Sequence, residues 1–197
     1  MKIKKVYIAS PLFNPSEREI NERIDGVLRQ EGFKTFLPQR DGFLYADLAS
    51  KLIEKGIAEE EAERISLQLI THLDVFQVCK RCDATVLNLE GRVPDEGAVS
   101  EAAMCFRSGK PLVIYKHDDR SLAYGKDNPL VVGLTDFDVV SNIEDIPQKL
   151  RKLERSWDVS GYKRMMKTAQ KVFGSYGRNP DILRLANLGV KYFGQKK

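Results

Sequence analysis

The chain has few of the residues on which disulfide and metal chemistry depend. Its 197 residues include 3 cysteines and 2 histidines. The odd number of cysteines argues against a disulfide framework. Cys79 and Cys82 have the two-residue spacing of redox and zinc motifs, but no second pair follows, and His72 and His117 do not have ligand spacing. We therefore expect no metal ion and no cofactor.

Long apolar runs and phosphate-binding loops are also missing. No stretch approaches the roughly 18 apolar residues of a membrane-spanning helix, and the N-terminus reads as a charged strand rather than a signal peptide. The sequence contains no Gly-rich G-x-G-x-x-G or Walker loop and no internal repeat. With 42% hydrophobic and 30% charged residues, the composition is that of a globular domain. We expect a cytoplasmic protein with no membrane partner.

Strand-like and helix-like segments alternate over the first 140 residues or so. The periodicity predicts strands at 2–9, 33–37, 84–89 and 111–116 and a last strand within 130–140. It predicts helices at 15–31, at 43–80 with a break near Gly56, and at 97–108. This alternation implies crossover connections and a parallel sheet of the α/β class.

The segment from Asp83 to Lys116 carries two acids at a place where a parallel sheet opens. Asp95 lies in the loop after a strand, Gly97 allows the chain to turn, and Glu101 is expected in the first turn of the next helix. The helix dipole there would favour the ionised carboxylate, which suits a nucleophile or a ligand for a developing cation. Acids are also common in first helical turns simply because the helix dipole stabilises them. This segment by itself therefore leaves a purely structural role for these acids open.

Further segments accompany these acids. They are Tyr7, SPLF at 10–13, LPQ at 37–39, LDVFQVCKRCDATVLNL at 73–89, DEGAVSE at 95–101, GKPLVIY at 109–115 and DNPL at 127–130. In this order they resemble the nucleoside 2-deoxyribosyltransferase family. The resemblance implies a flavodoxin-like, doubly wound sheet of five parallel strands, with a C-terminal helical extension. It also implies base exchange on 2′-deoxynucleosides.

The resemblance implies a catalytic role for four residues. Glu101 would be the nucleophile that forms a covalent deoxyribosyl ester after an oxocarbenium-like transition state, and Tyr7 would hydrogen-bond it and keep it ionised. Asp74 would be the general acid and base for the nucleobase, and Asp95 would hold sugar hydroxyls. Two alternatives stay open, a buried strand aromatic for Tyr7 and a solvent-facing acid for Asp74.

Five further positions are expected to bind substrate: Ser10, Phe13, Gln39, Gly97 and Asn128. Phe13 would stack near the base or sugar, Gln39 would contact the base, and Asn128 would reach the sugar site of a neighbouring subunit. The alternatives are a core aromatic for Phe13 and a turn residue for Asn128. The partners implied are a deoxynucleoside, a free purine or pyrimidine base, and further copies of the chain in a homo-oligomer with shared active sites.

Two other functions compete with base exchange. In the related 2′-deoxynucleoside 5′-phosphate N-hydrolases, the position of Asp95 tends to be a serine that serves the 5′-phosphate. An ionised Asp95 would repel a phosphate, whereas Ser10, Ser16 and Arg18 near the opening turn keep the hydrolase hypothesis open. The further alternative is a non-catalytic nucleotide-binding protein, against which the presence of Glu101 argues.

The C-terminal residues differ from the rest in charge. Residues 155–197 hold ten Lys/Arg and two Asp/Glu, whereas residues 1–154 hold 22 and 26. We therefore divide the chain into an α/β domain, 1–154, and a basic extension, 155–197, which reads as amphipathic helices at 159–174 and 180–193. Aromatics among the cations permit nucleic-acid binding. We favour packing of these apolar faces on the main domain or on a neighbouring subunit.

Overall fold

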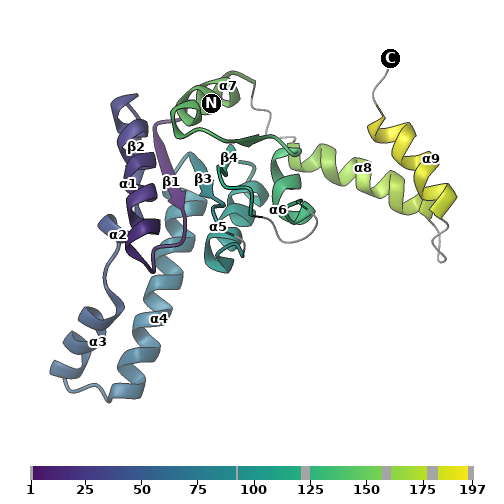
Figure 1. Ribbon diagram of the computed structural model, residues 1–197. Helices are drawn as coiled ribbons and strands as arrows, with labels where there is room; N and C mark the ends of the chain where they lie inside the picture. Colours follow the sequence, from purple (N-terminus) through teal and green to yellow (C-terminus); the bar gives the residue numbers. More distant parts are fainter. Residues whose placement is uncertain (1, 92, 121–124, 157–160, 177–181, 195–197) are drawn as a thin grey trace. The chain divides into compact units, whose positions relative to one another are not determined.

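A parallel sheet of five strands forms the centre of the protein (Figure 1). The computed structural model describes residues 2–91, 93–120, 125–156, 161–176 and 182–194. The strand order is β2-β1-β3-β4-β5, and every neighbouring pair is parallel. The strands are β1 (Lys5–Ala9), β2 (Lys34–Phe36), β3 (Ala84–Asn88), β4 (Leu112–Tyr115) and β5 (Val139–Val140). The predicted flavodoxin-like, doubly wound sheet is confirmed.

Helices connect the strands and cover both faces of the sheet (Figure 1). They are α1 (Pro15–Gln30), α2 (Pro38–Asp41), α3 (Tyr45–Glu54), α4 (Glu59–Phe76), α5 (Glu96–Arg107), α6 (Pro129–Val132) and α7 (Ile146–Ser156), and α4 continues into a π-helix at Gln77–Arg81. Short 3-10 helices lie at Gly133–Thr135 and Ile143–Asp145. The predicted break in the 43–80 helical region falls at Gly56, whose φ of +87° favours glycine.

Side-chain alternation along the strands divides the core into two layers. Val6 and Ile8 of β1 pack with Leu28 of α1 and Leu150 of α7, whereas Tyr7 lies on the other face with Ala102 of α5. Successive side chains of a strand point to opposite faces, so Tyr7 cannot join the first layer. The α5 face therefore receives the one aromatic hydroxyl of β1.

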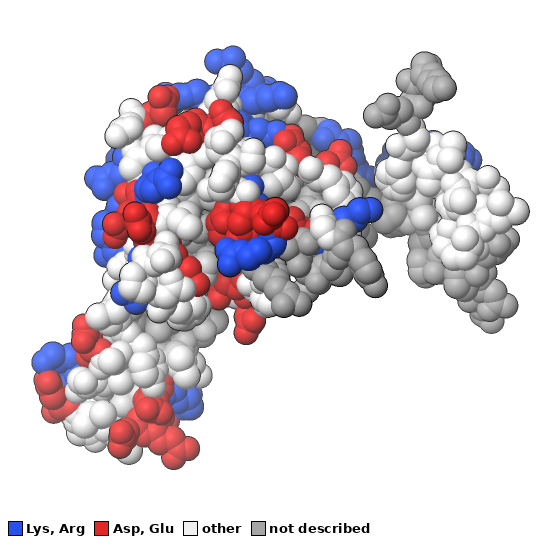
Figure 2. Space-filling view, viewed as in Figure 1, with Lys and Arg blue, Asp and Glu red and all other residues white. Residues whose placement is uncertain are grey.

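Helices α3 and α4 form a hairpin whose free end extends away from the sheet (Figure 1). Charged side chains of both signs cover that end (Figure 2), where Lys51 pairs with Glu54 at 2.8 Å and Arg64 pairs with Glu61 at 2.5 Å. Such pairs three residues apart support a solvent-exposed helix surface by a few tenths of a kcal/mol each.

The last strand lies within the predicted range of 130–140. Before it the chain forms α6, because Asn128 caps this helix with a hydrogen bond from Leu130 N at 3.0 Å and Pro129 occupies the first helical position. Only Val139 and Val140 form the fifth strand. The sequence analysis also missed α7, whose Ile146, Leu150 and Leu153 follow helical spacing and pack on the core.

The chain divides into two compact units, Met1–Trp157 and Asp158–Lys197. The second unit contains α8 (Gly161–Tyr176) and α9 (Ile182–Phe193). The predicted ranges for these two helices are 159–174 and 180–193. Of these, residues 159, 160, 180 and 181 lie outside the described residues. Leu188 of α9 is buried, whereas Met165, Met166 and Val190 are exposed. In the described segments, no helix combines the length and the apolarity that crossing a membrane requires.

Candidate active site

A hydrogen bond between Tyr7 and Glu101 joins the first strand to α5. Tyr7 is fully buried, and its ring stacks on Phe36 with centroids 5.4 Å apart and an interplanar angle of 14°. Its hydroxyl donates to Glu101 Oε1 at 2.5 Å. The packing of the ring holds the phenol in one orientation, so the hydrogen bond also orients the carboxyl group.

Glu101 lies one turn further along its helix than the sequence predicted. Helix α5 begins at Glu96, and Asp95 is its N-cap, with Oδ1 accepting from Ala98 N at 2.7 Å. Glu101 is thus in the second turn, where the dipole has largely faded. Gly97 leaves room for the cap, because a Cβ there would lie 3.2 Å from Asp95 Oδ1.

Burial opposes the ionisation of Glu101. It raises the pKa of this carboxyl group to about 8, with smaller contributions in the same direction from the charges of Asp74 and Asp95, while the hydrogen bond from Tyr7 acts the other way. Burial therefore works against the ionised Glu101 that the resemblance implies, and the ionised nucleophile stays a prediction. Burial and the charge of Glu101 also raise the pKa of Tyr7 far above its usual value, so the phenol remains a donor.

Asp74 is a second carboxyl group whose charge acts on the Tyr7 phenol. It is half-buried in the last turn of α4, and burial raises its pKa. Its charge acts on both Tyr7 and Glu101. Asp74 and Asp95 are thus close enough to act on the charge of Glu101. The strand order reverses between β1 and β3, and α/β folds bind ligands at such a point. A cation would be stabilised there.

A π-helix, Gln77–Arg81, begins three residues after Asp74. π-Bulges are rare and are frequent at functional sites. Lys110 Nζ stabilises this one by donating to Val78 O at 2.9 Å and to Cys82 O at 2.6 Å. The sequence analysis missed Lys110, because a lysine before an apolar strand does not signal which distant carbonyl groups it will reach.

A chain of buried amides joins the turn after β1 to the end of β3. Asn21 Nδ2 donates to Pro11 O at 2.7 Å, and Asn88 Nδ2 donates to Asn21 Oδ1 at 3.0 Å. Ser10 is buried next to this turn, and its hydroxyl has no hydrogen-bond partner within the described segments. The sequence analysis missed Asn21 and Asn88; buried asparagines inside an apolar pattern are the signal that could have indicated them.

The remaining predicted substrate residues are differently placed. Gln39 is held against α1, since Oε1 accepts from Asn21 Nδ2 at 3.1 Å and Nε2 donates to Arg18 O at 3.2 Å. Phe13 is 77% exposed, so the alternative of a core aromatic is wrong. Asn128 caps α6, in agreement with a turn residue, and its reach to a neighbouring subunit stays a prediction.

A charged cluster holds the loops after β3 and β4 together. Lys116 is buried and donates to Asp127 Oδ1 and to Arg120 O. Its Nζ also lies 3.9 Å from Asp118 Oδ1, and Asp118 Oδ2 accepts from Gly91 N at 2.7 Å. This cluster places Asp127 and hence the capping residue that follows it.

The fold has similar proteins among solved structures. A conserved protein from Enterococcus faecalis V583 is 23% identical, with 77% of this chain and 99% of that chain covered and a TM-score of 0.59. A 2-deoxyribosyltransferase from Bacillus psychrosaccharolyticus is 18% identical, with 73% and 90% covered and a TM-score of 0.50. A CMP N-glycosidase from Clostridium botulinum is 17% identical, with 75% and 99% covered and a TM-score of 0.46. At these identities the likeness shows the fold alone.

The sequence comparison is more specific than the structural one. No curated protein matches the chain. Residues 6–172 match the family described as nucleoside 2-deoxyribosyltransferase, a range that includes Tyr7, Asp74, Asp95 and Glu101 and most of the chain. The protein therefore belongs to the nucleoside 2-deoxyribosyltransferase family.

Proposed function

We propose that the protein is a nucleoside 2-deoxyribosyltransferase that exchanges the base of 2′-deoxynucleosides through a covalent ester on Glu101. The observation that carries this proposal is the 2.5 Å hydrogen bond from the buried Tyr7 hydroxyl to Glu101 Oε1. This hydrogen bond orients one carboxyl group, which has other acidic residues near it. The group lies at the end of the sheet where α/β folds bind ligands.

In the first half-reaction the bond between C1′ and the base breaks, and Glu101 forms a bond to C1′. The departing base takes a proton from Asp74, whose raised pKa favours the protonated acid. The charges of Asp95 and Glu101 stabilise the oxocarbenium character that develops on the sugar. Tyr7 keeps the nucleophilic oxygen aligned. The product is a deoxyribosyl ester of Glu101 and a free base.

In the second half-reaction an incoming base attacks C1′ and releases the Glu101 carboxylate. The proton that this base loses returns to Asp74. Two displacements at the same carbon restore the original configuration. Asp95 would bind a sugar hydroxyl with the oxygen that does not cap α5.

Deoxyinosine and adenine together test this proposal. We expect deoxyadenosine to form only when adenine is present, with free deoxyribose as a minor product, as separated and quantified by chromatography. Release of free deoxyribose at the same rate with and without adenine would contradict base exchange and would favour a hydrolase.

The hydrolysis of 2′-deoxynucleoside 5′-monophosphates is a second candidate. It is favoured by the buried Ser10 hydroxyl, which has no protein partner in the described residues and which a phosphate oxygen could satisfy. A carboxylate at Asp95 works against it, because an anion near the 5′ end repels a phosphate. The two functions thus make opposite predictions for the wild-type preference between a deoxynucleoside and its 5′-monophosphate.

Asp95→Ser is expected to weaken the preference for free deoxynucleosides over their 5′-monophosphates by about 5- to 100-fold. The change removes a like-charge penalty of about 1–3 kcal/mol in a partly dehydrated site. Serine also caps helices, so α5 keeps its start. The measurement is the ratio of kcat/KM values for deoxyinosine and its monophosphate. Asp95→Asn is the matched control, because it keeps the shape of the side chain and removes only its charge; it should also weaken the preference for free deoxynucleosides. A wild type that prefers the monophosphate would overturn the proposal.

The proposal includes a homo-oligomer with shared active sites. Leu69, Leu73 and Phe76 form an apolar stripe on α4 beside Asp74, with 41%, 47% and 52% of their surface exposed. Their helical spacing places them on one side of the helix, and a second copy of the chain would cover them.

Leu73→Glu is expected to lower the mass of the intact protein in light scattering, because a carboxylate cannot be buried unpaired at an apolar interface. Leu67→Glu is the control: Leu67 is 57% exposed but lies on a different side of α4, so its mass should not change. A wild type that is monomeric and fully active would contradict shared sites.

A further inference from the structure

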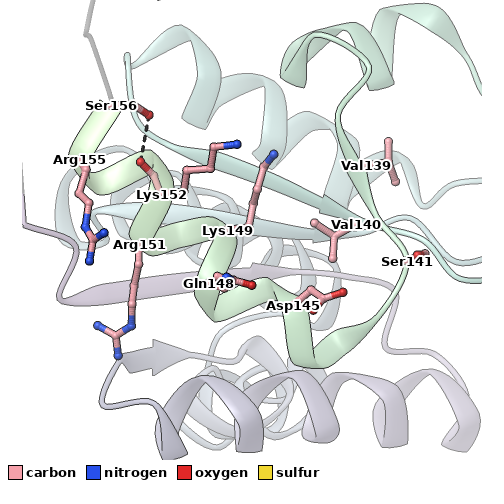
Figure 3. Close-up of a pocket in the computed structure, with 10 residues that line it drawn as sticks. All are labelled: Val139, Val140, Ser141, Asp145, Gln148, Lys149, Arg151, Lys152, Arg155 and Ser156. Carbon is pink, nitrogen blue, oxygen red and sulfur yellow. Dashed lines mark hydrogen bonds between the residues drawn. The ribbon is translucent and has the colours of Figure 1, made fainter.

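A cavity of about 820 Å³ lies beside the edge strand β5, and its lining does not include the residues of the candidate active site (Figure 3). Val139, Val140 and Ser141 line it from the strand and the residue after it. Helix α7 lines it with Gln148, Lys149 and Lys152 among others. Its volume lies within the range of cavities that bind small molecules.

The two sides of α7 explain why this cavity is both open and polar. Ile146, Pro147 and Leu150 are buried, and this side of the helix packs on the core. Lys152 and Arg155 are exposed on the surface of α7 that faces away from the core. They line the cavity (Figure 3). Residues three apart on a helix are neighbours, so the two side chains start from one surface of α7. In Figure 3 the Lys152 amine extends toward the side of Lys149, whereas the Arg155 guanidinium extends toward the side of Arg151.

The cations of the cavity differ in how they are paired. Lys149 is paired with Asp138. Arg151 forms an ion pair with Glu31 Oε2 at 3.3 Å and also donates to Glu31 O at 2.6 Å, and its guanidinium lies 5.0 Å from the centre of the Phe33 ring. Within the described part of the chain, Lys152 and Arg155 have no ion-pair partner.

One acid lines the cavity against these four cations. It is Asp145, whose Oδ2 accepts from Asn142 Nδ2 at 3.1 Å. Basic side chains gather over α7 at the top of Figure 2. The cavity therefore presents a positive wall opposite the two valines of β5, and an anion would not meet a matching number of negative groups there.

We infer that this cavity binds an organic polyphosphate. Its phosphate groups would accept charge-assisted hydrogen bonds from Lys152 and Arg155. Its apolar portion would rest on Val139, which is half-buried, and on Val140. Two separate cations, neither with an ion-pair partner among the described residues, fit a ligand with several phosphate groups better than a single carboxylate. The site is independent of the chemistry at Glu101.

The probes for this inference are adenosine triphosphate, tripolyphosphate and sulfate, titrated into the intact protein by calorimetry at constant ionic strength. We expect saturable binding of the triphosphate, weaker binding of tripolyphosphate because it has no apolar portion, and none of sulfate. Lys152→Gln/Arg155→Gln should weaken triphosphate binding by about tenfold or more, since it removes two charge-assisted hydrogen bonds.

Lys55→Gln is the matched control, because Lys55 is an exposed cation at the end of α3 and its loss should leave binding within about twofold if the cavity is the site. Circular dichroism checks that each variant is folded. The inference is overturned if the triphosphate does not bind saturably, if the control and the double variant lose affinity equally, or if an oligonucleotide binds through the same two residues more tightly than the triphosphate does.

Discussion

Glu101→Gln is expected to lower the rate of base exchange by about 10³-fold or more, because an amide cannot form the deoxyribosyl ester. The amide oxygen can still accept the hydrogen bond from Tyr7, so the fold should be unchanged. Initial rates with deoxyinosine and adenine measure the effect.

The covalent step has its own observable. Incubation of the wild type with a 2-fluoro deoxynucleoside analogue and no acceptor base should add the mass of the sugar to the protein, and peptide mapping should locate it on Glu101. The Glu101→Gln protein is the control and should not gain mass. An adduct on another residue, or a variant that keeps more than a few per cent of the rate, would show that the nucleophile is elsewhere.

The same substitution should change how stability depends on pH. The pKa of Glu101 is about 8 in the folded protein against an ordinary value of 4.5, so the folded state holds a proton that the unfolded state has lost between these values. The free energy of unfolding of the wild type therefore falls as pH rises through this range. Gln does not titrate. The free energy of unfolding of the variant minus that of the wild type should therefore rise between pH 4 and pH 9, by up to about 4 kcal/mol. Denaturant unfolding at the two pH values measures this difference.

Tyr7→Phe is expected to reduce kcat/KM at pH 7 by about 10- to 100-fold and to move the pH profile upward. Only the ionised Glu101 can attack, so the wild-type kcat/KM should rise with pH and level off above about 8. The Tyr7 hydrogen bond lowers the pKa of Glu101. Its loss raises that pKa, and the rising limb therefore moves to higher pH.

A full pH profile separates this effect from a general loss of structure. Phe keeps the stacking on Phe36 and the burial of the ring. Tyr115→Phe is the matched control, because Tyr115 is also a buried strand tyrosine but belongs to the other layer of the core. An unchanged pH profile for Tyr7→Phe, with activity near that of the wild type, would refute the positioning role of Tyr7.

The sequence by itself determined the architecture. Apolar periodicity is a local property, so the five strands and most of the long helices could be assigned from short windows, including the last strand within 130–140. Helix α6 and helix α7 were not predicted; α6 is a short helix that a capping asparagine and a proline begin. The resemblance then drew attention to the acids, because their order along the chain is itself part of the pattern.

Only the tertiary structure decided what the site residues do to one another. Tyr7 and Glu101 are 94 residues apart, and their hydrogen bond exists because β1 lies beside β3 and presents Tyr7 to α5. Likewise, the pKa of Glu101 depends on dehydration by surrounding side chains. The cavity at α7 depends on how that helix packs beside a two-residue strand. Burial and the separation of charges arise from contacts between distant segments, and no local window of the sequence contains them.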